Sequence, residues 1–332
     1  MNKKIKIEDI AKDAGVSLAT VSRCINHKGI VKEETYNKVI ASARRLGYEL
    51  EPVPYDASET DKLILFNLPS LGNPFFSEVV YGAKMSARRF GYQMLILEDV
   101  INTENIGTVL SLIRRTHAAG LITVNQIAAP ILSTLSSSIP LVQCCEYNEA
   151  LDLPRVSCND RQAAANVVSH LISLGRKRVA FLNGSTDFIY GRCRLEGYRD
   201  ALAKAGIPFD ESLVILIPNG GYDLAVSAAM QIINSENPPD AFFACSDVYA
   251  AAILRAAHLT GFRVPGDIAV SGFDNISLST STTPTITTVN QPKSQLGFTA
   301  AELLIERIQN PQAPVKNVVL DAELIIREST AV

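Results

Sequence analysis

The sequence predicts a small all-α helix-turn-helix domain followed by a two-lobed α/β domain with doubly wound parallel sheets. The 332 residues, 47% of them hydrophobic, suffice for two or three domains. Residues 1–48 show a helical apolar pattern and hold ten Lys and Arg against five Asp and Glu, a balance of +5. The remainder has 21 against 29, a balance of −8, and alternates short apolar runs with amphipathic helical stretches. Helices on both faces of parallel sheets produce this alternation.

The first predicted helix and its turn come from the stretch IEDIAKDAGVS, residues 7–17. Ile7, Ile10 and Ala11 form an apolar stripe at helical spacing. Gly15 stands where a tight turn between helices needs a left-handed backbone. Ser17 is a good N-cap for the next helix. The stretch therefore predicts a helix, a glycine turn and a second helix start.

Two further helices complete the predicted head. In the second helix Val21 and Ile25, four residues apart, share the buried face. Its opposite side carries Leu18, Ala19, Ser22 and Arg23. A third helix over roughly residues 32–46 ends at Gly47 and buries three apolar residues: Val39, Ala43 and Leu46. The basic balance indicates a nucleic-acid partner, since Lys and Arg bound to phosphates release counterions; a solvated terminal segment is the plainer alternative.

Residues 49–61, ELEPVPYDASETD, predict an extended linker. The segment combines two prolines with five carboxylates and has almost no apolar periodicity. Pro52 and Pro54 disfavour a helix, and acidic groups next to DNA lower affinity.

Residues 62–332 contain two series of strand-like apolar runs, which predict two lobes. The first series is KLILFNL, YQMLILE, GLITV and PLVQCC, and the second is RVAFLNG, LVILIP, DAFFACSD and DIAVSGFD. The late helix 293–309 has no place in the second series, so the chain is expected to cross between lobes near 155–160, 290 and 321. The predicted lobes are about 62–157 with 291–320, and about 158–290 with 321–332. A ligand is expected at the carboxyl ends of the strands, between the lobes.

The motifs resemble those of the LacI/GalR family of transcriptional regulators over essentially the whole chain. The head matches in IEDIAKDAGVSLATVSRCIN and in the helix from Thr35 to Tyr48. The large domain matches in NPFFSEVVYGAKMSARRFGY, GRCRLEGYRDALAKAGI, ACSDVYAAAIL, VPGDIAVSGFDNI and ELIIREST, among others. The resemblance implies a periplasmic-binding-protein-like effector domain behind a helix-turn-helix head.

For DNA, the resemblance implies that residues 17–26 lie in the major groove. It makes Leu18 and Ala19 the variable base readers and Arg23 a guanine contact. The full implied DNA-binding set is Ser17, Leu18, Ala19, Thr20, Ser22, Arg23 and Asn26, of which Ser17, Thr20 and Asn26 contact phosphates.

The chain departs from the family at three places. Lys6 and Lys32 stand where Thr or Ser is usual, so the first and third helices should each start less firmly, by about 1 kcal/mol. The linker lacks the family's Pro-Asn and the leucine of its short hinge helix. We therefore expect no minor-groove wedge from residues 49–61.

Polar and aromatic residues at the predicted strand ends are the candidates for the effector site. Their plainer alternative is that they cap helices or pack in the core. Arg194 matches the family arginine that forks onto ligand hydroxyls or carboxylates, and a carboxylate such as Asp274 accepts from two vicinal hydroxyls. The full candidate set is Asn73, Phe75, Phe76, Phe188, Tyr190, Arg194, Tyr222, Asp247 and Asp274.

The sequence gives little support for catalysis, cofactors or metals. There is no GxSxG, HExxH or GxxxxGK motif, and the four histidines are scattered. The six cysteines show no metal-ligand spacing and are expected to be reduced thiols. A charged N-terminus without an apolar signal region, and no run of 18 apolar residues, predict a cytoplasmic protein without a membrane partner.

The sequence thus predicts a ligand-responsive transcriptional regulator, a repressor rather than an enzyme. As a homodimer, or a tetramer, it would bind a pseudo-palindromic operator, because two symmetric heads read more base pairs than one. The expected effector is a sugar or sugar derivative, with a nucleoside or purine as the alternative. A solute-binding receptor of transport and a sugar-processing α/β enzyme are the competing functions.

Overall fold

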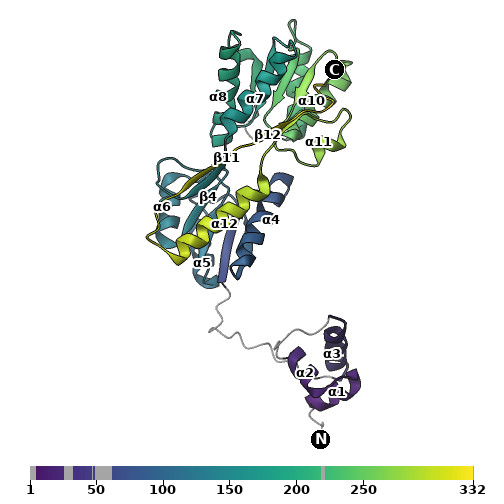
Figure 1. The fold of residues 1–332 in the computed structure, drawn as a ribbon, viewed down its shortest axis with the longest axis vertical. Helices are drawn as coiled ribbons and strands as arrows, with labels where there is room; N and C mark the ends of the chain where they lie inside the picture. Colours follow the sequence, from purple (N-terminus) through teal and green to yellow (C-terminus); the bar gives the residue numbers. More distant parts are fainter. Residues whose placement is uncertain (1–4, 26–32, 47, 49–61, 218–220, 332) are drawn as a thin grey trace. The chain divides into compact units, whose positions relative to one another are not determined.

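The computed structural model describes residues 5–25, 33–46, 48, 62–217 and 221–331. The chain divides into two compact units, Met1–Thr60 and Asp61–Val332 (Figure 1). The predicted linker 49–61 lies outside the described residues, and so does the expectation that it forms no hinge helix. No helix in the described ranges has the length and apolar character needed to cross a membrane.

The small unit consists of α1 (Ile7–Ala14), α2 (Leu18–Ile25) and α3 (Glu33–Leu46). Gly15 ends α1 in the left-handed conformation, with φ 66°, which confirms the predicted turn. The Thr20 N–H donates to Ser17 Oγ (3.2 Å), so Ser17 caps α2 as predicted. Its core is formed by buried side chains from all three helices: Ile10, Ala11, Val21, Cys24, Val39 and Ala43. Leu46, predicted to be buried, lies partly buried at its edge.

The start of α1 shows how the chain manages without a hydroxyl cap. The Lys6 side chain makes no cap hydrogen bond, but the Lys6 backbone N–H donates to Asp9 Oδ2 (2.8 Å). This is the reciprocal half of a capping box, and it offsets part of the predicted weakness. Asp13 near the end of α1 accepts from Ser42 and Arg45 of α3, which ties the first helix to the third. Lys32 lies outside the described residues.

The first lobe of the large unit is built on a six-stranded parallel sheet with the order β11-β5-β4-β3-β1-β2. Its strands are β1 (Lys62–Leu68), β2 (Tyr92–Glu98), β3 (Gly120–Thr123), β4 (Leu141–Cys144), β5 (Arg155–Cys158) and β11 (Asn317–Leu320). Its helices are α4 (Pro74–Arg89), α5 (Ile106–Thr116), α6 (Ala129–Ser138) and α12 (Lys293–Gln309). Helices α4 and α12 run side by side over one face, packed on Ile64 and Phe66, whereas α5 and α6 cover the other face, packed on Leu65 (Figure 1). Burial of both faces explains why residues 63–66 of β1 are all apolar.

The second lobe is built on a four-stranded parallel sheet with the order β7-β6-β8-β9. Its strands are β6 (Val179–Asn183), β7 (Val214–Leu216), β8 (Ala241–Ala244) and β9 (Ala269–Ser271). Its helices are α7 (Asp160–Ser173), α8 (Ile189–Lys204), α9 (Tyr222–Ile233), α10 (Asp247–Thr260) and the short α11 (Leu278–Ser281), with a 3₁₀ turn, η1, at Glu211–Leu213. Stacked rings of Phe181 and Phe243, with centroids 4.5 Å apart, lie in its core.

Short strands occur where the sequence predicted only crossings. Strands β5 and β11 add to the far edge of the first sheet. Strands β10 (Thr288–Asn290) and β12 (Glu323–Ile325) form an antiparallel pair. The predicted late helix 293–309 is confirmed as α12, which packs with the first lobe although its sequence follows the second.

Candidate functional site

A cavity of about 470 Å³ lies between the two lobes of the large unit. The carboxyl ends of strands from both sheets border it, because each lobe places its βα loops on the side that faces the other lobe. Seven of the nine candidate residues line it: Asn73, Phe75, Phe76, Phe188, Tyr190, Arg194 and Asp274.

The start of α4 contributes one wall. Asn73 caps the helix, since its Oδ1 accepts from the Phe75 N–H (3.0 Å), and Pro74 occupies the first turn. The rings of Phe75 and Phe76 meet edge to face with centroids 5.4 Å apart. Phe75 also packs in the first-lobe core. Asn73 therefore caps α4 while both Asn73 and Phe75 line the cavity.

The start of α8 contributes the facing wall. Phe188 and Tyr190 stack with centroids 5.6 Å apart, and Arg194 follows one turn later. Burial raises the pKa of Tyr190 well above its usual value, so its hydroxyl stays protonated. The two aromatic walls give the cavity apolar faces on opposite sides.

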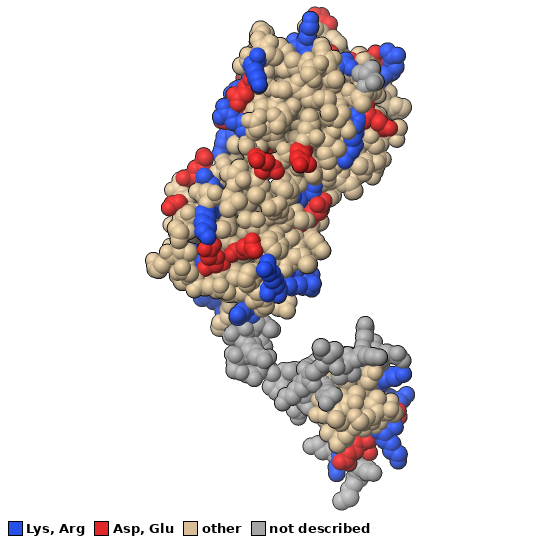
Figure 2. Space-filling view, in the orientation of Figure 1, with Lys and Arg blue, Asp and Glu red and all other residues tan. Residues whose placement is uncertain are grey.

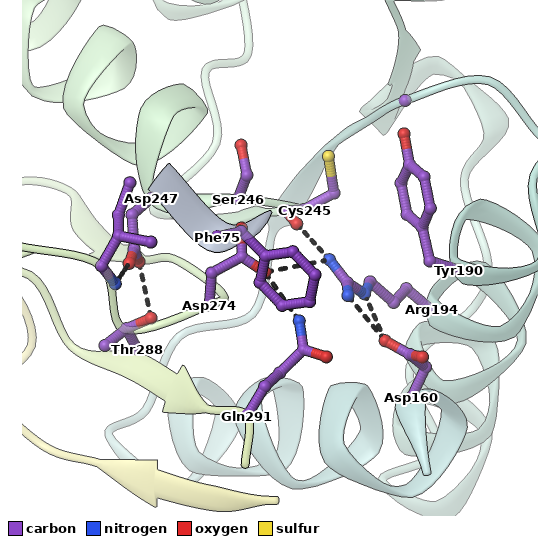
Figure 3. A network of polar contacts seen from close by, with 12 residues as sticks. Phe75, Asp160, Tyr190, Arg194, Cys245, Ser246, Asp247, Asp274, Thr288 and Gln291 are labelled. Carbon is purple, nitrogen blue, oxygen red and sulfur yellow. Dashed lines mark hydrogen bonds and ion pairs between the residues drawn. The ribbon is translucent and has the colours of Figure 1, made fainter. Parts of the chain in front are cut away.

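Arg194 is held by protein groups rather than left free at the cavity wall (Figure 3). Its Nε and one terminal nitrogen each lie 2.7 Å from Asp160 Oδ1. The other terminal nitrogen donates to the Cys245 carbonyl and lies 3.9 Å from Asp274 Oδ1. The guanidinium lies over the Phe273 ring, 3.5 Å from its centroid. The Arg194 guanidinium, which was expected to bind ligand, thus donates mainly to protein groups.

Asp274 lies in the loop after β9 with φ 105°, in the left-handed region that side chains rarely adopt. Its Oδ1 accepts from Gln291 Nε2 (2.7 Å), and its carbonyl accepts from Lys293 Nζ (2.6 Å). Burial raises the pKa of this carboxyl to about 6 against the opposing effect of Arg194. A buried carboxylate at the cavity wall suits recognition of ligand donors.

Two candidates lie outside the cavity lining. Asp247 is fully buried, and its carboxylate accepts from the Ile276 N–H (2.8 Å) and the Thr288 hydroxyl (2.5 Å) (Figure 3). These bonds fasten the loop after β9 to α10, and burial raises the Asp247 pKa to about 7. Tyr222 begins α9 with 41% of its surface exposed.

Two carboxylates that line the cavity, Glu146 and Asp160, were not among the candidates. Glu146 follows β4, and it accepts from the backbone N–H groups of Ile189 (2.9 Å) and Tyr190 (3.2 Å) across the cleft. Burial raises the Glu146 pKa to about 7. Glu146 comes directly after the apolar run PLVQCC, so the strand-end signal that selected Asp274 was present for it too. Asp160 follows RVSC and Asn159, where the sequence shows no clear apolar run.

Thiols form a further part of the lining, through Cys145, Cys158 and Cys245. Burial raises the pKa values of Cys158 and Cys245 to about 12, which keeps both thiols neutral. The Cys144 and Cys145 sulfurs lie 3.6 Å apart. Among the described residues, no three His, Cys, Asp or Glu side chains converge in a way that would hold a metal ion.

In the small unit, α2 presents the face expected to read DNA. Leu18 is 44% exposed and Ala19 is exposed, whereas Val21 is fully buried, as the helical pattern predicted. Ser17 is exposed and Thr20 and Ser22 are partly buried. The Arg23 side chain and Asn26 lie outside what the structure describes.

Comparison with known proteins agrees with both units. The family profile "Bacterial regulatory proteins, lacI family" matches residues 6–50. The profile "Periplasmic binding protein-like domain" matches residues 168–330. The HTH-type transcriptional repressor CytR of Escherichia coli strain K12 is 31% identical over 328 residues, which cover 98% of this chain and 96% of that protein.

Solved structures show the same architecture. The transcriptional regulator CelR in complex with cellobiose superposes with a TM-score of 0.75 at 27% identity, covering 98% of this chain and 99% of that one. The lac repressor dimer bound to operator and anti-inducer superposes with a TM-score of 0.75 at 24% identity, covering 99% and 100%, and supports the fold. The predicted fold class and the predicted class of function, a ligand-responsive DNA-binding transcriptional regulator, are confirmed. The chain belongs to the lacI family of bacterial regulatory proteins.

Proposed function

We propose that this protein represses transcription by binding a pseudo-palindromic operator as a dimer, and that a small molecule in the interlobe cavity alters its operator affinity. The observation that carries the proposal is the union, in one chain, of a helix-turn-helix head and a two-lobed unit with a 470 Å³ cavity. A ligand between the lobes favours one lobe arrangement, and by linkage it changes DNA affinity only as far as it binds the two arrangements differently.

In this proposal residues 1–48 bind DNA and residues 49–61 connect them to the effector domain 62–332. The base readers are Leu18 and Ala19, through apolar contact with thymine methyl groups, and Arg23, through a bidentate contact with guanine. Residues 1–48 have a charge balance of +5 and the remainder of the chain one of −8. Figure 2 shows Lys and Arg as well as Asp and Glu side chains on the visible side of both units. The difference in charge balance favours the head as the DNA-binding part.

The dimer is supported by an apolar surface at the edge of the first sheet. Strand β2 is an edge strand, and its neighbouring residues Leu95 and Ile96, whose side chains point to opposite faces of the sheet, are 39% and 38% exposed. Tyr81 and Met85, four residues apart on the adjacent α4, are 60% and 46% exposed. An apolar edge strand left uncovered favours aggregation, so a second copy is its natural cover. We name Tyr81, Met85, Leu95 and Ile96 the edge patch.

For the effector we propose a sugar or sugar derivative. Aromatic rings on two walls with carboxylates and an arginine between them suit a ring with an apolar face and a polar rim. The CelR structure holds cellobiose, which favours a carbohydrate over the nucleoside alternative. We exclude Asp247 and Tyr222 from the proposed contacts because neither lines the cavity.

We further propose that the protein has no enzymatic activity. The relatives it matches are transcriptional regulators. The carboxylates at the cavity are tied to backbone donors, to Arg194 or to Gln291, in arrangements that position groups rather than activate a nucleophile. Chemical turnover of a bound ligand would contradict this proposal.

The test is selection from randomised duplex DNA by the full-length protein, followed by sequencing of the bound pool. We expect a two-fold symmetric site with half-sites about one helical turn apart, or a multiple of it. Deletion of residues 1–48 should abolish enrichment while ligand binding persists. A protein that binds ligand but enriches no DNA sequence would instead support the solute-receptor alternative.

A further inference from the structure

The cavity lining is unbalanced in charge. Glu146, Asp160 and Asp274 line it, each with 7% or less of its surface exposed, while Arg194 is the one cationic side chain among the described lining residues. Burying carboxylates without matching cations is costly in free energy. With all three carboxyls ionised, the described lining side chains therefore carry two more negative than positive charges.

Arg194 supplies one positive charge against three carboxyls, and protein acceptors already take three of its five N–H groups. Two of its nitrogens bind one oxygen of Asp160, and the third binds the Cys245 carbonyl (Figure 3). Lys293, which is also buried, does not line the cavity, and its ammonium donates to the carbonyls of Asp274 (2.6 Å) and Asn275 (3.2 Å).

Two carboxylate oxygens are left open. Asp160 uses Oδ1 for Arg194, and Asp274 uses Oδ1 for Gln291, so each Oδ2 accepts no hydrogen bond from the described residues. Arg194 lies between the two carboxylates (Figure 3). The lining thus offers acceptors and negative charge at these two oxygens. The aromatic walls add π faces, which also attract cations.

We propose that the effector carries a cationic nitrogen, as an amino sugar does, which binds the open oxygen of Asp274. The proposal rests on the proposed function, since it takes this cavity as the effector site. A charged N–H donor satisfies this oxygen and balances part of the buried charge, and charge-assisted bonds of this kind are the strong ones. A neutral sugar satisfies the oxygen but leaves the charge, and an acidic sugar increases it.

The titration of the cavity gives an independent readout. Burial raises the pKa of Asp274 to about 6 and that of Glu146 to about 7. Arg194, Lys293, Gln291 and Asp160 face Asp274, while Arg194, Asp160 and the α8 backbone N–H groups face Glu146. A bound cation lowers both pKa values, so an amine ligand should release protons and bind more tightly as pH rises from 5 to 7.

The test compares matched ligands on the full-length protein by thermal shift and titration calorimetry. The pairs are glucosamine with glucose, galactosamine with galactose, and 2-aminoethanol with ethylene glycol, and glucuronate is the anionic probe. We expect at least one amine to bind at least tenfold more tightly than its neutral partner, with proton release near pH 6.5. Asp274→Asn should reduce this preference at least fivefold. Asp200→Asn, which removes a surface carboxylate of α8 paired with Arg161, should retain it.

Three outcomes would overturn the inference: a neutral or anionic probe that binds as tightly as the amines, no response to any amine up to 100 mM, or amine binding without proton release. If Asp274→Asn does not fold, the test rests on the wild-type protein: proton release on amine binding supports the inference, and its absence contradicts it. Operator selection is measured on the same preparation. Sequence-specific DNA binding without amine preference defeats the inference alone, whereas loss of specific DNA binding defeats the proposed function.

Discussion

Glu146 is a single side chain that links the two lobes. It follows β4 in the first lobe, and its carboxylate caps the start of α8 in the second through Ile189 and Tyr190. Burial raises its pKa from 4.5 to about 7, so the folded protein holds this proton more tightly than the unfolded chain does. Ionisation of Glu146 therefore lowers the free energy of unfolding as pH rises from about 4.5 to about 7.

We predict that Glu146→Gln flattens this part of the stability profile. The variant should start less stable than wild type, because one amide replaces a two-oxygen acceptor, but its melting temperature should fall less between pH 5 and pH 7.5. Thermal melts across that range measure the slope. Glu149→Gln, at an exposed neighbour, should keep the wild-type slope. Parallel curves for Glu146→Gln and wild type would mean that the carboxyl does not titrate in this window.

Arg23 tests the proposed reading of DNA at the level of one side chain. Arg23→Ala should cost about 1–3 kcal/mol at one base pair of each half-site and relax discrimination there. Lys6→Ala, at an exposed lysine before α1, should weaken binding to all sequences alike and reduce the salt dependence. Fluorescence anisotropy on a set of single-substitution operators separates the two patterns. A uniform loss from Arg23→Ala would identify a phosphate contact and a different helix register.

Most of the candidate residues chosen from the sequence line the cavity, but the sequence does not show what they bind. Phe75 and Phe188 were found because they follow strand ends, and Arg194 was found because it matches the family arginine; all three line the cavity. Asp247 follows a strand end in the same way, yet its carboxylate turns to Ile276 and Thr288, which are distant in sequence. Side-chain direction of this kind depends on tertiary neighbours, so a single sequence does not reveal it.

At the level of elements, the close approach of α4 and α12 in the first lobe is built on glycine. A Cβ on Gly82 of α4 would lie 1.8 Å from the Ser294 carbonyl oxygen of α12, and a Cβ on Gly297 would lie 1.8 Å from that of Val79. The two helix backbones therefore touch, and no larger residue fits without moving them apart.

We predict that Gly82→Ala destabilises the protein by about 1–3 kcal/mol or more, because one helix must shift off the other. Gly107→Ala is the matched control, since Gly107 is an exposed glycine in α5 with open space around its Cβ position. It should be neutral or stabilising by up to about 1 kcal/mol through helix propensity. Urea denaturation measures both, and equal stability of Gly82→Ala and wild type would show that α4 and α12 separate at little cost.

Long helices and apolar strands were predictable, whereas short strands of mixed polarity were not. Helix α12 appears at its predicted residues 293–309 because seventeen residues repeat the helical apolar pattern. Strands β5 (RVSC) and β12 (ELI) are too short and too mixed in polarity to show a period. They become strands because β4, β11 and β10 supply partners, which is a tertiary effect.

At the scale of the whole molecule, the edge patch makes the dimer testable. Leu95→Lys with Tyr81→Lys places two charges in a surface we expect to be buried between copies, so the protein should become monomeric and lose operator affinity at least tenfold. Light scattering coupled to size exclusion measures the mass. Leu174→Lys, at an exposed leucine of the second lobe outside this patch, should remain dimeric. A dimer that survives the double substitution would place the interface elsewhere.

At the same scale, we expect a ligand in the cavity of the large unit to change the affinity of the head for its operator. The direct measurement is the operator dissociation constant of the full-length protein, with and without a saturating ligand found in the thermal-shift panel. We predict a change of at least fivefold in one direction, within the range of about 1–3 kcal/mol typical of coupled sites, and its loss in Asp274→Asn. An operator dissociation constant that stays the same at saturating ligand would contradict the account.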